Sequence, residues 1–398
     1  MEEKKLKDIC EFIVDCPHST AKDEGSGYPL IRTPNVGKGR LILQGVHRVN
    51  EHVYKTRIER ATPSVGDIIL AREAPVGNAA IIMPGQKVCL GQRVVLLRAK
   101  REIVNPMFLV YYLLSNEVQH KLKNNANGAV VAHLNMDEIR NLELSIPDIN
   151  IQDKIATILS SIDDKIEVNR RINDNLEQQA QALFKSWFVD FEPFKDQPFV
   201  KSELGMIPKG WKVCGLKDIL ELKKDTIKKG DNNSIPYLPI DVIPMHSLGI
   251  NEFRLNNEAQ SSLQLFDKDD IIIGAMRVYF HRVVIAPEKG ITRSTCFVLK
   301  PKYPNSRSFC TLLCNTEDAI NHANKTSKGS TMPYAVWEGG LNTYRFVLPP
   351  SEIIERFEEI TLNMLCHIRD GYKEREHLAE LRDTLLPRLM SGQLKLNN

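Results

Sequence analysis

The stretch "IQDKIATILSSIDDKIEVNRRINDNLEQQAQALFKSW", residues 151–187, decides the fold. Its apolar residues recur mostly at spacings of three and four, and it contains no proline, which is the pattern of a helix with one apolar stripe. At a rise of about 1.5 Å per residue, this helix would be roughly 55 Å long. The stripe consists of Ile151, Ile155, Ile158, Ile162, Ile166, Ile172, Leu176, Leu183 and Trp187.

A second stripe of the same kind follows about 200 residues later. Ser351, directly after Pro350, is a good N-cap for its helix, and Glu352 suits the first turn. At one constant offset, Ile155 corresponds to Phe357. Gly371 and Pro387 are expected to weaken this second helix locally. The second stripe consists of Ile354, Phe357, Ile360, Met364, Ile368, Leu378, Leu381, Leu385 and Leu389.

The segments before the two helices also repeat each other. The matching phrases are LKDI (Leu6–Ile9) with LKDI (Leu216–Ile219), GDIILA (66–71) with DDIIIG (269–274), VVLLRA (94–99) with CFVLKP (296–301), and ELSIP (143–147) with RFVLP (345–349). Several of these phrases are β-branched runs bounded by Gly, Pro or Asp, which indicates short strands. The chain therefore consists of a globular segment and a long helix, each present twice.

A helix with a single apolar stripe needs a partner, and its own duplicate is the obvious one. We predict an α+β fold in which two α/β domains are separated by two long antiparallel coiled-coil helices, with internal duplication and pseudo-two-fold symmetry. The expected boundaries are 1–147 for the first domain, 148–192 for the first helix, 193–349 for a linker and the second domain, and 350–398 for the second helix. The linker is assigned to residues 192–211, which contain prolines and glycines.

The amino-acid composition limits the classes of protein to which this chain can belong. The 398 residues suffice for two cores, and 42% hydrophobic with 26% charged residues is typical of a soluble globular protein. Apolar runs stay well short of the roughly 18 residues of a membrane span. The N-terminus "MEEKKLKDIC" lacks the apolar core of a secretory signal. We therefore expect a cytoplasmic protein without membrane contact.

Metal ligands are not expected from the sequence. The eight cysteines contain no C-x-x-C pair, and we interpret them as reduced apolar thiols. Cys310 and Cys314 are four residues apart, so a structural zinc site there is the alternative. The ten histidines form no H-E-x-x-H or comparable cluster.

Basic and amide side chains gather in or beside the Gly- and Pro-rich turns of both globular segments. Each alone is more ordinary as a solvated surface charge. Together, on related loops, they fit a surface that contacts phosphates and reads base edges. The predicted DNA-binding residues are Asn35, Lys38, Arg40, Arg48, Arg57, Arg72 and Arg93 in the first segment, and Arg254, Arg277, His281, Arg282 and Arg293 in the second.

The end of the first helix, "ALFKSWFVDFEPF" (residues 182–194), is rich in aromatic residues. A membrane anchor is excluded because the cluster is short and follows a highly charged helix. Base stacking is a weaker possibility, since the basic loops lie elsewhere in the sequence. Two interpretations stay open: packing against the second domain, or an apolar surface that binds a partner. The partner-binding candidates are Trp187, Phe188 and Phe191.

The sequence lacks the common signatures of catalysis. The phosphate-binding pattern G-x-x-x-x-G-K-[ST] is missing, and "MPYAV" (332–336) is not the Asn/Asp-Pro-Pro-aromatic motif of amino-methyltransferases. The adjacent acids of "SIDDKIE" lie on the long helix, where a solvated face explains them better than a nuclease site. We therefore predict no catalytic residues and a recognition protein rather than an enzyme.

These features together resemble a known family. The helix phrase above, "GDIILAREAPVGNAAII" (66–82), "GMIPKGW" (205–211) and "HLAELRDTLLPRLMSGQLKL" (377–396) are similar to the specificity subunit of type I restriction-modification enzymes. The resemblance extends over essentially the whole chain, and the helix phrase and "LLPRLMSGQL" are its most specific parts. The second globular segment departs more from the phrasing common in the family, as domains that read different sequences would.

The resemblance implies that the two globular segments are target-recognition domains, each reading one half of a split double-stranded DNA target in the major groove. It also implies that the conserved helices set the spacer and hold two methyltransferase subunits, to which motor-nuclease subunits are added. S-adenosylmethionine, ATP and Mg would then be bound by those partners and not by this chain. The alternative is a coiled-coil adaptor protein without DNA recognition.

Overall fold

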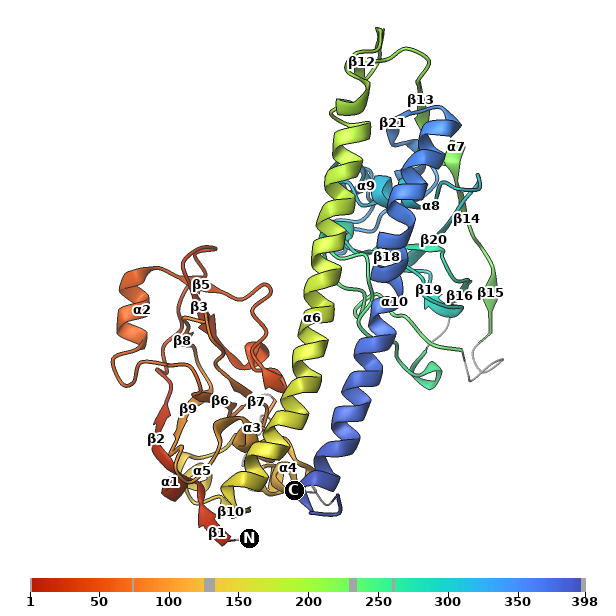
Figure 1. Cartoon of the computed structure of the whole chain (residues 1–398). Coiled ribbons are helices and arrows are strands. Elements are labelled where there is room, and N and C mark those ends of the chain that lie inside the picture. Colours follow the sequence, from red (N-terminus) through yellow and green to blue (C-terminus); the bar gives the residue numbers. More distant parts are fainter. Residues whose placement is uncertain (1, 74, 125–132, 229–234, 260–261, 395–398) are drawn as a thin grey trace. The chain divides into compact units, whose positions relative to one another are not determined.

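The computed structural model of the chain describes residues 2–73, 75–124, 133–228, 235–259 and 262–394 (Figure 1). The chain divides into two compact units. Unit 1 comprises Met1–Lys165 with Leu378–Asn398, and unit 2 comprises Ile166–His377. The boundary falls inside both long helices, α6 (Ile149–Phe188) and α10 (Ser351–Met390). The sequence-based boundaries divide the chain by element rather than by compact unit, and they stay a prediction.

Unit 1 is an α/β domain. Its shorter elements are β1 (Glu2–Lys5), α1 (Leu6–Ile9), β2 (Cys10–Asp15), β3 (Tyr28–Ile31), β4 (Gly39–Arg40), β5 (Arg48–Val49), α2 (Glu51–Arg57), β6 (Ile68–Ala71), β7 (Ala79–Ile81), β8 (Cys89–Leu90), β9 (Val94–Ala99), α3 (Pro106–Leu114), α4 (Asn116–Asn124), α5 (Met136–Arg140) and β10 (Glu143–Ile146). A five-stranded sheet has the order β2-β9-β6-β7-β4, and a three-stranded sheet has the order β5-β3-β8.

The central strand β6 shows why these residues form a sheet core. All four of its residues are buried, and alternate side chains point to opposite faces. Ile68 and Leu70 join the core that contains α3 and the start of α6. Ile69 and Ala71 join a second core on the other face. A strand covered on both faces must be apolar throughout, as this one is.

Unit 2 repeats this construction. Its shorter elements are β11 (Phe199–Ser202), β12 (Gly205–Pro208), β13 (Lys212–Gly215), α7 (Leu216–Ile219), β14 (Leu220–Leu222), β15 (Thr226–Ile227), β16 (Leu263–Phe266), β17 (Ile271–Gly274), β18 (Val283–Ile285), β19 (Gly290–Arg293), β20 (Cys296–Pro301), α8 (Arg307–Cys314), α9 (Glu317–Lys325) and β21 (Arg345–Leu348). Its sheets have the orders β14-β20-β17-β18 and β15-β16-β19. As in β6, Ile271 and Ile273 of β17 face one core and Ile272 faces the other.

The predicted duplication is confirmed element by element. The phrase LKDI forms α1 in unit 1 and α7 in unit 2. Before each of these helices, a strand pairs antiparallel with the strand that precedes a long helix, β1 with β10 and β13 with β21. The predicted α+β class with two α/β domains is likewise confirmed.

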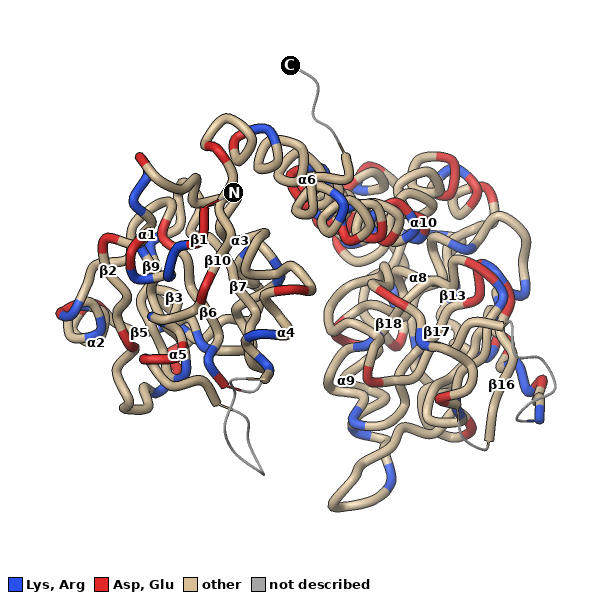
Figure 2. Tube along the Cα trace, turned by 90° about the horizontal axis from the view of Figure 1, so that it is seen from below, with Lys and Arg blue, Asp and Glu red and all other residues tan. Residues whose placement is uncertain are grey.

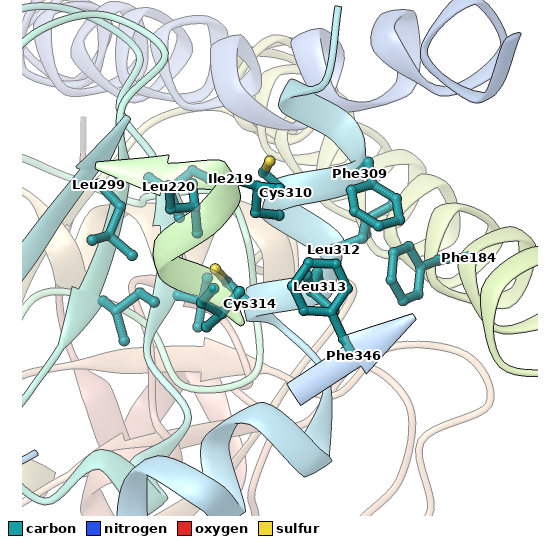
Figure 3. Close-up of a cluster of buried hydrophobic side chains, with 14 of the residues drawn as sticks. Phe184, Ile219, Leu220, Leu299, Phe309, Cys310, Leu312, Leu313, Cys314 and Phe346 are labelled. Atoms are coloured by element: carbon teal, nitrogen blue, oxygen red, sulfur yellow. The ribbon is translucent and has the colours of Figure 1, made fainter. Parts of the chain in front are cut away.

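The core of unit 2 forms around α8 (Figure 3). Leu220 and Leu299 lie on one side of this helix, and Phe184 and Phe346 lie beside Phe309 on another. The Cys310 thiol is buried in the same cluster, and burial raises its pKa to about 12. A thiol in this environment stays protonated and packs as a small apolar group. All eight cysteines are free, as the sequence predicted.

The two long helices pack antiparallel in each unit. In unit 1, Ile155 near the start of α6 shares a core with Leu389 near the end of α10. In unit 2, Phe184 near the end of α6 packs against Phe357 near the start of α10, with ring centroids 6.2 Å apart. Among the described residues, no helix is both long and apolar enough to cross a bilayer.

Two details of the helices differ from the sequence prediction. First, α10 continues through Gly371 and Pro387. A Cβ on Gly371 would collide with the side-chain amide of Asn173 on α6, so glycine leaves room for that side chain between the helices. Second, some residues of the predicted stripes are exposed rather than buried. These residues are Ile151, Ile172, Ile360 and Leu381.

Part of the segment predicted as a linker packs into the core of unit 2. It contains the antiparallel hairpin of β11 and β12. Phe194, Ile207 and Trp211 from this segment are buried in the same core as Phe184. Proline and glycine in this segment therefore mark tight turns of a packed structure.

Candidate nucleic-acid interface

Three segments of unit 1 meet at the end of β6. The backbone N–H of Arg72 donates to the carbonyl of Arg93 at 3.0 Å, and the N–H of Leu134 donates to the carbonyl of Arg72 at 3.0 Å. Glu73 and His133 form an isolated antiparallel bridge beside these bonds. We call residues 72–73, 92–93 and 133–134 the unit 1 junction. It fixes the turn before β9 and the segment before α5 against the strand end.

The unit 1 junction carries several hydrogen-bonding side chains. Nη1 of Arg72 donates to Oδ2 of Asp15 at 2.8 Å, and Nε of Arg93 lies 3.0 Å from Oε2 of Glu73. The side chain of Arg93 is 57% exposed, so its outer nitrogens are open to a ligand. Arg72, Glu73, Gln92 and Arg93 line a hollow of about 220 Å³ together with His18.

Unit 2 contains the same backbone arrangement. The N–H of Ala275 donates to the carbonyl of Thr295 at 2.8 Å, and the N–H of Ala335 donates to the carbonyl of Ala275 at 2.8 Å. Met276 and Tyr334 form the antiparallel bridge that corresponds to the one in unit 1. We call residues 275–277, 294–295 and 334–335 the unit 2 junction. The duplication therefore extends to loop contacts that no repeated phrase contains.

The unit 2 junction carries different side chains. Arg277 is exposed and has φ +50°, a left-handed conformation that is uncommon for residues other than glycine. Among the residues that the structure describes, none forms a hydrogen bond or ion pair with its guanidinium. Tyr279 and Tyr334, which are 47% and 48% exposed, present aromatic surface on neighbouring segments. Unit 1 thus offers an ion-paired polar hollow, and unit 2 offers an exposed arginine with aromatic rings.

The remaining candidates of unit 1 lie away from the junction. Lys38 is exposed, and Nη2 of Arg40 pairs with Asp164 of α6 at 2.6 Å. Arg48 donates through Nη1 to the carbonyl of Gly27 at 2.8 Å. The structure thus brings together Arg72 and Arg93 but not these three residues.

Two further candidates of unit 1 are held inside the protein. Asn35 accepts from the N–H of Arg32 at 3.2 Å and donates to the carbonyl of Ile42 at 3.3 Å. Nη2 of Arg57 donates to the carbonyl of Ser19 at 2.7 Å. Both side chains are buried and stabilise their own loops, so contact with DNA would require an opening of those loops. Their assignment to DNA contact stays a prediction.

In unit 2 several of the other candidates are engaged within the chain. Arg254 pairs with Asp241, and Nη1 of Arg282 donates to the carbonyl of Ile240. Arg293 is partly buried, and its Nε has no hydrogen-bond partner among the described residues. His281 is 4% exposed and faces Glu317. Of the five unit 2 candidates, Arg277 is the one that belongs to the junction.

Sequence reasoning missed Gln92, His18 and His133 of unit 1 and Tyr334 of unit 2. A signal for them was available, because Arg72 immediately follows the repeated phrase GDIILA and Ala275 immediately follows DDIIIG. The residues that follow a repeated strand occupy equivalent positions in the two units even where the residue types differ. Only the structure shows which loops pack against the end of that strand.

The aromatic residues at the end of α6 lie in unit 2. Phe188 is buried, with ring centroids 4.8 Å from Phe357 and 4.9 Å from Phe309. Trp187 and Phe191 are partly buried against the same core, and Phe191 lies 5.5 Å from Trp211. These contacts favour internal packing, one of the two interpretations left open by the sequence. Partner binding through Trp187, Phe188 and Phe191 stays a prediction.

Positive and negative side chains are mixed along the two long helices. Figure 2 shows acidic and basic residues interleaved along α6 and α10. Ion pairs between neighbouring turns, such as Arg170 with Glu167 and with Asp174, keep these helix faces solvated. The net charge of +3 therefore does not define a binding face, and the junctions are distinguished by the geometry of their side chains.

Comparison with known proteins identifies the family. The sequence model described as "Type I restriction modification DNA specificity domain" matches residues 1–178 and 208–361. The chain belongs to this family. The two matched segments correspond to the duplicated halves of the chain, and together they cover most of it. The predicted resemblance is therefore confirmed.

Known relatives match most of the length of the chain. The type I restriction enzyme MjaIX specificity subunit of Methanocaldococcus jannaschii is 29% identical over 99% of this chain and 93% of its own length. The type I restriction enzyme HindI specificity subunit of Haemophilus influenzae is 23% identical over 83% of this chain and 86% of its own. The S subunit of a type I restriction-modification system from M. genitalium shares the fold, with a TM-score of 0.53 and 16% identity over 98% of this chain and 95% of that one.

As a member of the type I restriction-modification DNA specificity family, this chain is a recognition subunit and not an enzyme. Family membership thus confirms the prediction of a non-catalytic DNA-recognition role.

Proposed function

We propose that each unit of this specificity subunit reads one half of a bipartite double-stranded DNA target, and that the junctions contact the bases in the major groove. The observation that carries this proposal is the duplicated junction, in which identical backbone hydrogen bonds hold different side chains. A constant frame with variable side chains is what two readers of different sequences require.

The side chains of the two junctions suit different base edges. Arginine can donate two hydrogen bonds to guanine, and glutamine can pair with adenine, so Arg72, Gln92 and Arg93 offer donors for direct readout. Tyr279 and Tyr334 offer apolar contact surface beside Arg277. Exposed basic side chains elsewhere, such as that of Lys38, would contact phosphates and position the duplex without reading its sequence.

The long helices would set the unread spacer between the half-sites and hold two methyltransferase subunits. Apolar side chains that α6 and α10 leave exposed, such as Ile172 and Ile360, support a partner-binding role for the helices. Motor-nuclease subunits would join this complex. We further propose that those partners, and not this chain, bind S-adenosylmethionine, ATP and Mg. The assembled complex would work in the cytoplasm.

The test is to map methylated sites in the host genome and then to exchange residues 21–145 with the corresponding segment of a relative. We expect a bipartite motif with a fixed gap, and the exchange should alter one half while leaving the other half and the gap unchanged. A matched exchange in unit 2 should alter the opposite half. A contiguous motif, or an exchange that changes nothing, would contradict the proposal and favour the adaptor alternative.

A further inference from the structure

Three side chains from separate segments of unit 2 converge on one point. His246 lies in the loop before β16, His281 lies after η4 (Val278–Phe280), and Glu317 is the first residue of α9. Nδ1 of His281 lies 3.2 Å from Oε1 of Glu317, and Nδ1 of His246 lies 4.0 Å from the same oxygen. One potential ligand atom from each residue lies within 4.8 Å of the other two.

The hydrogen bonds of His281 show which ring nitrogen is available. Nε2 lies 3.1 Å from the carbonyl oxygen of Asn315, which can only accept, so Nε2 must carry the proton. In the neutral ring, Nδ1 then presents its lone pair toward the carboxylate of Glu317. This nitrogen is buried and has no hydrogen-bond partner among the described residues. A lone pair facing a carboxylate is unfavourable unless a cation lies between them.

The backbone at both histidines is constrained in a way that supports the site. His246 has φ +52° and His281 has φ +51°, a left-handed region that residues other than glycine rarely adopt. The N–H of His246 donates to the carbonyl of His281 at 2.8 Å, which ties the two residues together. Strained backbone of this kind concentrates at functional sites, where the surrounding structure compensates its cost.

An ion pair between protonated His281 and Glu317 would also place a cation between Nδ1 and the carboxylate. That ion pair needs only one ring, and it gives no role to His246, whose ring centroid lies 4.7 Å from that of His281. A single metal ion would use a lone pair from each ring. The carbonyl of Asn315 then acts as the outer partner that orients a metal-bound histidine.

We propose that His246, His281 and Glu317 bind one divalent transition-metal ion, with Zn²⁺ as the natural occupant. Two imidazoles and a carboxylate form a ligand set that Zn²⁺ accepts, and they suit the harder ions Mg²⁺ and Ca²⁺ poorly. At ligand distances of about 2.0–2.1 Å, neighbouring tetrahedral ligands lie about 3.3 Å apart. The separation of 3.2 Å between His281 and Glu317 matches this value, whereas His246 lies 4.0 Å from the same oxygen. The exposed side chain of His246 would therefore have to move toward the other two ligands to complete the geometry.

The surroundings of the site suggest its effect. His246 and Glu317 are exposed, which gives the ion a path of entry and leaves a fourth position for water. The bound ion would join the loop of His246, the turn that follows η4 and the start of α9. Because η4 directly follows Arg277, the ion would brace the segment that carries the unit 2 junction.

The experiment uses the full chain, freed of metal with a chelator and titrated with Zn²⁺ by calorimetry. We expect saturation at one ion per chain, a higher melting temperature with the ion bound, and a visible d–d spectrum when Co²⁺ is used instead. Because His281 is buried, the exposed ligands are changed. His246→Ala and Glu317→Gln should each weaken binding by at least about tenfold, since even outer-shell partners contribute about 10–100-fold.

The chain offers matched controls. Asp318 is an exposed carboxylate in the same helical turn as Glu317, and His367 is an exposed histidine of unit 2 outside the cluster. Asp318→Asn and His367→Ala should leave the affinity unchanged. The proposal is overturned if Zn²⁺ does not saturate, or if His246→Ala and Glu317→Gln bind it as tightly as the unchanged chain. DNA binding is not measured, so this outcome is independent of the proposed function.

Discussion

The phenol of Tyr111 on α3 donates a hydrogen bond of 2.6 Å to Oδ2 of Asp163 on α6. Nη1 of Arg382 on α10 donates to the other oxygen of the same carboxylate at 2.8 Å. Asp163 is 4% exposed, and it therefore connects the domain of unit 1 to both long helices through buried polar contacts. A buried carboxylate with two such donors is satisfied, but each of its partners depends on it.

We predict that Asp163→Ala destabilises unit 1, because it removes the buried counter-charge of Arg382 and leaves only its pair with Asp383, which is 55% exposed. The free energy of unfolding should fall by ~3 kcal/mol. The neighbouring Asp164→Ala is the control, since Asp164 is 61% exposed and its pair with Arg40 should contribute at most about 1 kcal/mol. Denaturant titration of the full chain, with amide exchange of α3 as the local probe, measures both changes. Equal effects of the two variants would refute the proposed connection.

Glu177 predicts a pH dependence of stability. Burial raises its pKa from 4.5 to about 7, although the N–H of Leu248 and the hydroxyl of Ser247 donate to it and favour the charged form. Between these values the folded chain keeps a proton that the unfolded chain has released. This group should therefore make the free energy of unfolding fall as pH rises from about 4.5 to 7, by ~3 kcal/mol in total.

Glu177→Gln should remove that decline, because glutamine has no charge to bury and its one amide oxygen can still accept from the N–H of Leu248. We expect the variant to match the unchanged chain near pH 4.5 and to exceed its stability at pH 8. Thermal unfolding across this range measures the difference, and Glu359→Gln on the exposed face of α10 serves as the control. A difference between variant and unchanged chain that does not vary with pH would contradict the assignment.

The packing of Phe188 predicts a large loss of stability on truncation. Phe188→Ala would leave a cavity between Phe309 and Phe357, at a cost of about 3–5 kcal/mol in unit 2. Val189→Ser, at a neighbouring position that is 53% exposed, should leave melting unchanged. Melting curves and binding to the methyltransferase subunit are measured on both variants. Unchanged melting of Phe188→Ala with loss of partner binding would instead support the exposed-surface interpretation.

Particular residues show how far the sequence could predict the fold. The offset that matches Ile155 with Phe357 predicted both helices and their antiparallel pairing, since a repeated apolar stripe has few other ways to be buried. The same pattern could not predict that Ile172 is exposed, because exposure depends on how far apart the helices run at that point. Prolines in the predicted linker indicated turns but not the burial of Phe194 and Trp211.

For the candidate interface, residue type alone was an incomplete guide. Arginine and asparagine are usually exposed, yet Asn35 and Arg57 are held by backbone carbonyls of their own loops. Arg72 and Arg93 meet because β6 pairs with β9 in a particular register, which a single sequence does not specify. His246, His281 and Glu317 are too far apart in sequence to form a recognisable metal motif, so the cluster could be found only from the structure.

Arg277 gives a specific prediction for DNA recognition. Arg277→Ala should weaken binding of the assembled complex to its target by about tenfold or more, since a good base contact contributes ~1–3 kcal/mol. Discrimination should be lost in one half-site only. Arg171→Ala is the control, because Arg171 is 73% exposed on α6 and is outside both junctions. Titrations with target duplexes altered in either half measure the effect. Uniform weakening across all sequences would reassign Arg277 to a phosphate contact.

The final prediction concerns α6 as the element that sets the spacer. Inserting four residues near positions 169–173 adds about one helical turn, or ~6 Å. We expect the preferred spacer of the methylated motif to lengthen by about 1–2 base pairs, at the ~3.4 Å rise of DNA. The insertion also displaces Asn173 from Gly371, so a second variant carries a matching insertion in α10 to restore that close approach. Methylation mapping of both variants measures the gap. If the gap stays constant while both half-sites are still read, helix length does not determine the spacer, and the loops of the two units must do so instead.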